Sequence, residues 1–151
     1  MPQLKIPARF LKVRYNGAAH PHASLTGLEA GANCQRFAFA LLEHFGYAIA
    51  PMRSSELWAD RRFTRRVHRM RPCDILMFNR EEKAWGAHLA VYVGNGRAIH
   101  LSKALGLPAI WDLAEFARCP RYKILLGIKR PIVRAGRPAP ERASSEVIAR
   151  A

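Results

Sequence analysis

The sequence is poor in cysteine and in acidic residues, and each shortage excludes a class of protein. Only three cysteines are present, Cys34, Cys73 and Cys119, and they lack the spacing of a structural zinc site or a disulfide framework. Eleven acidic residues stand against 25 lysines and arginines, which gives a formal net charge of +14. A field of this sign attracts anions such as nucleic acid, an acidic membrane or an anionic cell-wall polymer. The charge alone does not choose among them.

Long hydrophobic runs are also missing. No apolar run approaches the length of a membrane span, and the first residues, Met1 to Pro7, lack the charged start and apolar stretch of a secretory signal. We therefore expect no transmembrane segment. The compartment is unknown, with a cytoplasmic location by default or export by a non-classical route. At 151 residues, half of them apolar, the chain is expected to form one core.

Turn signals and hydrophobic periodicity divide the chain into three parts. Residues 1–30 are loop-like, residues 31–130 form the expected domain, and residues 131–151 have the composition of a flexible tail. The domain is predicted to be α+β, with a helix-rich half followed by a strand-rich half. Its expected elements are a helix over 34–45, a helix from about 56 that ends before Pro72, a strand over 74–78, a hairpin over 87–101, a helix over 112–117 and a strand over 122–128.

The segment from His88 to His100 predicts a β-hairpin that carries one histidine on each strand. Two apolar, β-branched runs flank Gly94-Asn95-Gly96, which is typical of a tight turn. A two-residue loop would place Val91 opposite His100 and send His88 to the other face of the sheet. A three-residue loop would pair Ala90 with His100, and both histidines would then be diagonal neighbours on one face. A catalytic pair requires the second register.

Cys34 stands at the predicted start of the helix over 34–45. Asn33 is suited to cap this helix because its side chain can accept a backbone N–H of the first turn. At a helix start the dipole and the free N–H groups stabilise a thiolate, and the same N–H groups can form part of an oxyanion hole. An isolated cysteine is more often a small buried apolar residue. The two histidines nevertheless favour a nucleophile here.

The cysteine and the two histidines have separate predicted roles in catalysis. His88 is the predicted general base that takes the proton of Cys34, and His100 is predicted to fix the tautomer of His88 through a hydrogen bond. The alternative for each histidine is a half-buried strand residue without a catalytic role. A metal site built from these three side chains would lack the further ligand of a usual coordination set, so no metal or other cofactor is predicted.

The sequence around these residues resembles that of the NlpC-type cysteine peptidases, which are cell-wall endopeptidases, over roughly residues 15–129. Asn33-Cys34-Gln35-Arg36 stands where the family has Asp-Cys-Ser-Gly. Pro72 to Phe78 matches its Pro-Gly-Asp-Leu-hydrophobic-Phe strand. His88 to Gly94 matches its His-x-x-hydrophobic-Tyr-hydrophobic-Gly strand, and His100 follows where a second polar residue is usual. Pro51-Met-Arg53-Ser54-Ser55 is similar to the Pro-Arg-Ser segment after the first helix.

The resemblance implies a papain-like core in which the helix carrying Cys34 packs on an antiparallel sheet. It also implies thiol-dependent cleavage of peptidoglycan stem peptides after γ-D-glutamate, or of another small amide. Asn33 and Gln35 replace the family's Asp and Ser, which removes a negative charge from the pocket that receives a free amine. The predicted substrate-binding residues are Asn33, Gln35, Arg53, Ser54 and Tyr92.

Two other interpretations remain open. The run from Asn33 to Phe37 is similar to the Asn-Cys-Glu-His-Phe of lecithin:retinol acyltransferase-like proteins, which implies acyl transfer or thioester hydrolysis at the same thiol. In those proteins histidine precedes cysteine, whereas Cys34 precedes His88 here. The other interpretation is a nucleic-acid-binding or polyanion-binding protein without catalysis. Its contacts would come from the basic run of the second predicted helix, although such a run is usually a solvated face: Arg61, Arg62, Arg65, Arg66 and Arg69.

Overall fold

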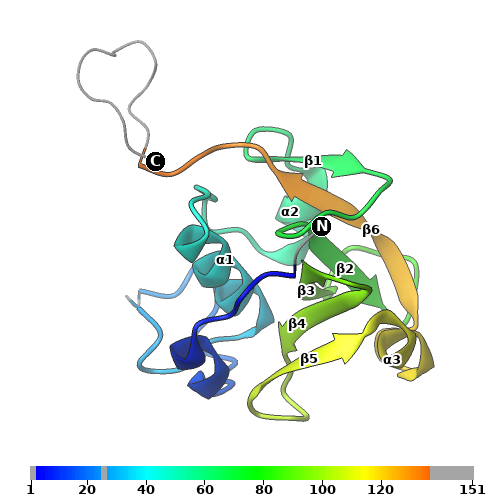
Figure 1. Ribbon diagram of the computed structural model, residues 1–151, viewed down its shortest axis with the longest axis horizontal. Coiled ribbons are helices and arrows are strands. Elements are labelled where there is room, and N and C mark those ends of the chain that lie inside the picture. The colour runs from blue at the N-terminus through cyan, green and yellow to red at the C-terminus, as the bar shows by residue number, and fades with distance from the viewer. Residues whose placement is uncertain (1–2, 25–26, 137–151) are drawn as a thin grey trace.

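A computed structural model describes residues 3–24 and 27–136 as an α+β arrangement around one antiparallel sheet (Figure 1). Six strands lie in the order β1-β6-β2-β3-β4-β5, and each neighbouring pair is antiparallel. The α+β class predicted from the sequence is confirmed. The elements in chain order are η1 (Ala8–Lys12), α1 (Cys34–His44), α2 (Ser54–Ala59), β1 (Thr64–Val67), β2 (Ile75–Asn79), β3 (His88–Gly94), β4 (Arg97–Leu101), β5 (Pro108–Asp112), α3 (Leu113–Arg118) and β6 (Ile124–Pro131).

Helix α1 covers one face of the sheet and contacts β3 and β4 (Figure 1). The helix begins where expected because Asn33 Oδ1 accepts the backbone N–H of Arg36 at 2.9 Å. It ends before Gly46, whose φ of +98° lies in the left-handed region that glycine adopts without strain. Phe37 and Leu41 on its inner face are buried against the sheet. The predicted helix is confirmed, and Cys34 is its first residue.

Helix α3 lies on the opposite face of the sheet. Asp112 precedes its first turn, and Glu115 Oε1 accepts the backbone N–H of Asp112 at 2.8 Å, which helps to fix this helix start. Phe116 is buried and stacks on Phe78 of β2 with ring centroids 4.5 Å apart. Both faces of the central strands are therefore covered, which places His88 and His100 between the sheet and the aromatic side chains around α3.

The long second helix expected from about residue 56 to Pro72 is wrong. Helix α2 ends at Ala59, and β1 follows at the edge of the sheet. The cause is Asp60, whose carboxylate accepts the backbone N–H groups of residues 62, 63 and 64 and the hydroxyl of Thr64 at 2.7 Å. These hydrogen bonds stabilise a turn that ends the helix, and β1, which follows the turn, pairs with β6.

Other boundaries differ from expectation at the edges of the sheet. Strand β5 was not predicted, and β6 runs on to Pro131. Beyond it, residues assigned to the tail still pack on the domain, because Ala48 N donates to Val133 O at 2.8 Å and Ala135 N donates to Gly46 O at 2.8 Å. The rest of the predicted tail, residues 137–151, lies outside the described residues. Within the described part of the chain, no helix has the length and apolar character needed to cross a membrane.

Candidate active site

The β3–β4 hairpin sets the position of both histidines. Its tip is a two-residue turn at Asn95 and Gly96, both with positive φ, and a β-bulge precedes the turn between Tyr92 and Gly94. The bulge adds one residue to β3, so Tyr92 pairs with Ala98. Continued along the strands, this register places Ala90 opposite His100, as a three-residue loop would. Of the two loops that the sequence left open, the two-residue loop is present, but the bulge gives the register of the three-residue loop, which a catalytic pair requires.

His88 and His100 meet on the face of the sheet that carries α3. Nε2 of His88 and Nδ1 of His100 form a hydrogen bond of 2.8 Å between two buried side chains. Burial lowers the pKa of His100 to about 4. Burial, and then the neighbouring His100, lower the pKa of His88 well below its ordinary value of 6.5. Both imidazoles are therefore neutral at physiological pH.

The surroundings of His100 decide which ring nitrogens carry the protons. Nε2 of His100 is buried and has no hydrogen-bond partner among the described residues. Its ring packs against Trp111 and Phe116, with centroids 4.3 and 4.7 Å away. An N–H is favourable beside electron-rich aromatic rings, whereas a lone pair is not. We therefore assign the proton to Nε2 of His100, so that its Nδ1 accepts Nε2–H of His88 and Nδ1 of His88 is free to act as a base.

Cys34 is partly exposed at the start of α1, and its sulfur lies among backbone N–H groups. Burial raises the pKa of the Cys34 thiol above its ordinary value, while hydrogen bonding from the backbone N–H groups of Leu89, Gln35 and Cys34 itself opposes this rise. Leu89 directly follows His88 in β3, so the sulfur lies beside the start of that strand. The resting site thus pairs a thiol with a neutral imidazole.

Cys34 and His88 line the same open cleft, which has a volume of about 360 Å3. His100 lies beneath it, behind His88. Four exposed cationic side chains also line the cleft, and none of the described residues that line it is acidic. The cations come from four different segments of the chain: Arg53, Arg80, Lys103 and Arg121.

Three of the five predicted substrate-binding residues lie in this cleft: Asn33, Gln35 and Arg53. Asn33 Nδ2 donates to Gln35 Oε1 at 3.2 Å, so the two side chains that replace the family's Asp and Ser hold each other. Ser54 and Tyr92 do not line the cleft, against expectation. Ser54 is buried at the start of α2, because the chain turns there from the cleft into the core. Tyr92 points along the hairpin, where its hydroxyl accepts the backbone N–H of Gly96 at 2.9 Å.

Two tyrosines that line the cleft were not predicted from the sequence. Tyr122 stacks on His88 with ring centroids 4.2 Å apart and ring planes 16° apart, which fixes the orientation of the imidazole. Tyr15 also lines the cleft, and its pKa is raised first by burial and then by repulsion from Cys34 when that thiol is ionised. Neither residue lies in a recognisable motif, and both are far in sequence from the residues they meet. A single sequence contains no signal for either contact.

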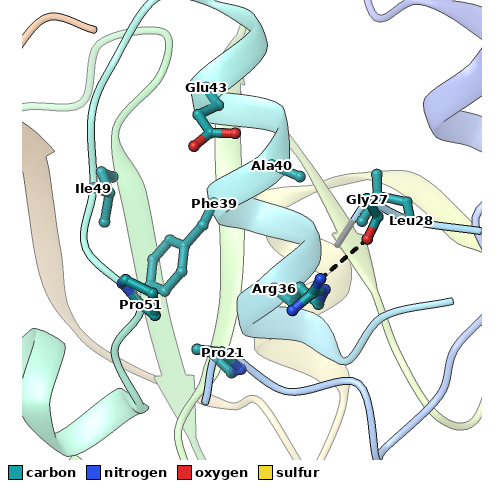
Figure 2. A pocket seen from close by; sticks show the side chains of 9 residues that line it. All are labelled: Pro21, Gly27, Leu28, Arg36, Phe39, Ala40, Glu43, Ile49 and Pro51. Carbon is teal, nitrogen blue, oxygen red and sulfur yellow. Dashed lines mark hydrogen bonds between the residues drawn. The ribbon is translucent and has the colours of Figure 1, made fainter. Parts of the chain in front are cut away.

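A separate hollow lies beside α1, and neither Cys34 nor His88 lines it; Figure 2 shows the side chains that do. Its volume is about 190 Å3. Arg36, which stands where the resembling family has glycine, donates to Gly27 O at 3.2 Å and to His20 O at 3.5 Å. These bonds fasten the N-terminal loop to the first turn of α1. His22 of this loop is exposed and pairs with Glu56 at 2.8 Å.

Comparisons with known proteins found no family model and no curated protein that matches this chain. Among residues 3–24 and 27–136, no three His, Cys, Asp or Glu side chains come together in a way that could hold a metal ion. The fold and the site together define an α+β protein with a cysteine at a helix start, a hydrogen-bonded histidine pair and a cationic cleft.

Proposed function

We propose that this protein has a papain-like core and is a thiol-dependent amide hydrolase, with Cys34 as nucleophile, His88 as general base and His100 as the residue that orients His88. The observation that carries this proposal is the shared cleft of Cys34 and His88, together with the 2.8 Å hydrogen bond from His88 to His100. Nucleophile, base and orienting group are the three parts that acyl transfer through a thiol requires.

In the proposed reaction, Nδ1 of His88 takes the proton of Cys34 as the sulfur attacks the amide carbonyl. The developing imidazolium is stabilised by the lone pair of His100 Nδ1, which accepts the Nε2–H of His88. His88 then returns the proton to the leaving amine as the C–N bond breaks, which leaves a thioester on Cys34. Water, deprotonated by His88, attacks the thioester and releases the acid, and the thiol is restored.

The oxyanion of the tetrahedral intermediate is assigned to donors at the start of α1. The backbone N–H of Cys34 is one of the groups that hydrogen-bond to the sulfur region, and it is free of helical partners in the first turn. The hydroxyl of Tyr15 is the second proposed donor, since Tyr15 lines the same cleft as Cys34. Tyr15→Phe is expected to lower kcat more than it raises KM.

The proposed substrate is a peptidoglycan stem peptide that is cut after γ-D-glutamate. A glutamate linked through its γ-carboxyl keeps a free α-carboxylate beside the scissile amide, and the cleft offers four cations to receive such groups. A substrate amine has no carboxylate partner among the described lining residues. Recognition is therefore expected to depend on the acidic groups of the stem peptide rather than on its free amine.

Digestion of purified muropeptides, with the products identified by mass spectrometry, tests the proposal. The unmodified protein is expected to release fragments that end in D-glutamate, and Cys34→Ala is expected to release none. Cys119→Ala is the matched control, since Cys119 is another partly exposed free cysteine that does not line the cleft. Identical product profiles for the unmodified protein and Cys34→Ala would refute the proposal. Products joined to an added amine or alcohol instead of water would favour acyl transfer.

A further inference from the structure

A second basic hollow lies at the edge of the sheet where β1 pairs with β6, and it shares no lining residue with the cleft of Cys34. Its volume is about 520 Å3. Helix α2 separates the two sites, because Arg53, just before α2, lines the cleft while Trp58, near its end, lines the hollow. The other lining residues are Ala59, Asp60, Arg61, Arg65, Arg66 and Lys129.

Two cations of this hollow face each other at a position that strand pairing disfavours. Arg66 of β1 lies directly opposite Lys129 of β6 in the ladder, and like charges in opposed positions destabilise a sheet. Lys129 is also only 1% exposed. Its ammonium donates to Trp58 O at 3.2 Å and to Asp60 O at 2.6 Å, which leaves the third N–H of Nζ for another acceptor.

The carboxylate nearest to these cations already accepts hydrogen bonds from other groups. Asp60 is the one acid among the described residues that line the hollow. Its carboxylate accepts hydrogen bonds from the backbone of residues 62 to 64 and from the hydroxyl of Thr64. Within the described part of the chain, no ion pair joins a carboxylate to Arg61, Arg65 or Arg66. The hollow therefore gathers four cationic side chains around one partly neutralised acid.

The side chains that form the wall of the hollow are closely packed. The Trp58 indole lies so close to Gly127 of β6 that an added Cβ there would come within 2.8 Å of the ring. Arg66 lies over this indole, with its guanidinium carbon 3.8 Å from the ring centroid, and donates to Trp58 O at 3.3 Å. Trp58 thus holds Arg66 and, through its carbonyl, Lys129 in fixed positions.

We propose that this hollow is a binding site for a terminal phosphate group, held by Arg61, Arg66 and Lys129 with Arg65 at the rim. Guanidinium groups match phosphate oxygens in pairs, and a lysine adds a point charge. Lys129 lies at the bottom, so the group that reaches it must enter the hollow. A phosphomonoester or free phosphate can present three oxygens in this way. A phosphodiester that runs along a nucleic-acid backbone lies across the opening instead.

Isothermal titration calorimetry tests the proposal. The full-length protein is titrated with inorganic phosphate and with glycerol 3-phosphate at constant ionic strength. Saturable binding is expected, and Arg61→Gln is expected to weaken it about tenfold, the effect of losing one charge-assisted hydrogen bond. Arg62→Gln is the matched control. It removes the same charge from an exposed neighbour that does not line the hollow, and binding is expected to change less than about twofold. Stronger binding of glycerol 3-phosphate would identify an ester rather than free phosphate as the ligand.

Equal losses of affinity in Arg61→Gln and Arg62→Gln would overturn the proposal, because they would indicate attraction by net charge alone. Duplex DNA without terminal phosphates is a further probe. If it binds and phosphate does not, the surface is a nucleic-acid contact and the phosphate site is refuted. Cys34→Ala is expected to bind phosphate as tightly as the unmodified protein, so the outcome is independent of the proposed hydrolase activity.

Discussion

The buried histidine pair predicts a specific loss of stability in acid. His100 is fully buried, and its pKa is about 4 in the folded protein against an ordinary value of 6.5. The unfolded chain therefore binds a proton on this residue at a higher pH than the folded protein does. The contribution of the neutral, buried His100 to stability is fully present above about pH 6.5 and is lost as the pH falls toward about 4. Below pH 6.5 this loss is about 1.4 kcal/mol for each pH unit, so between pH 7.5 and 4.5 it amounts to about 2–3 kcal/mol.

Urea unfolding of the unmodified protein and of His100→Asn at these two pH values measures this effect. The free energy of unfolding of the unmodified protein is expected to fall by about 2–3 kcal/mol more than that of the variant between pH 7.5 and 4.5. Each protein is compared with itself, so any packing loss in the variant cancels. His68→Asn, which removes an exposed histidine, is the control and should retain the full pH dependence. Parallel curves for the unmodified protein and His100→Asn would refute the account of the pair.

Three further predictions follow from single contacts. Gly127→Ala would bring a Cβ within 2.8 Å of the Trp58 ring and should lower the free energy of unfolding by about 1–3 kcal/mol in urea denaturation; an unchanged value would contradict this packing. Asp74→Ala would leave Arg130 without the carboxylate that it contacts twice at 2.8 Å. The free energy of unfolding, measured by the same assay, should fall by about 3 kcal/mol. A decrease of less than about 0.5 kcal/mol would contradict this ion pair. Alkylation of Cys34 by iodoacetamide should still accelerate above pH 9.0, since burial raises the thiol pKa; a plateau below pH 8 would contradict this.

Local sequence patterns were sufficient to predict the parts of the molecule that local interactions determine. Asn33 and Gly46 bound α1 through a cap and a left-handed residue, which both act within one turn of the helix. The two glycines around Asn95 likewise determine the hairpin. The sequence left two registers of this hairpin open, and a bulge rather than a longer loop provides the one in which both histidines share a face.

Long-range contacts account for what sequence analysis missed. Phe63, Val67 and Met70 have helical spacing, yet Val67 belongs to a strand that forms only because β6 lies beside it. Tyr122 and the cations at the rim of the cleft come from separate loops that meet only in the folded protein. Composition predicted a surplus of positive charge, but not its division between a cleft and a second hollow.

The central claim is that Cys34 and His88 act together to form a thioester with an amide substrate. The most direct test is mass spectrometry of the protein and of its proteolytic peptides after the turnover of a muropeptide is quenched in acid. The unmodified protein should carry the acyl mass on a peptide that contains Cys34, and His88→Gln should carry none, because the thiol has lost its base. Cleavage without an adduct on Cys34 in the unmodified protein, or an equal adduct in His88→Gln, would contradict the account.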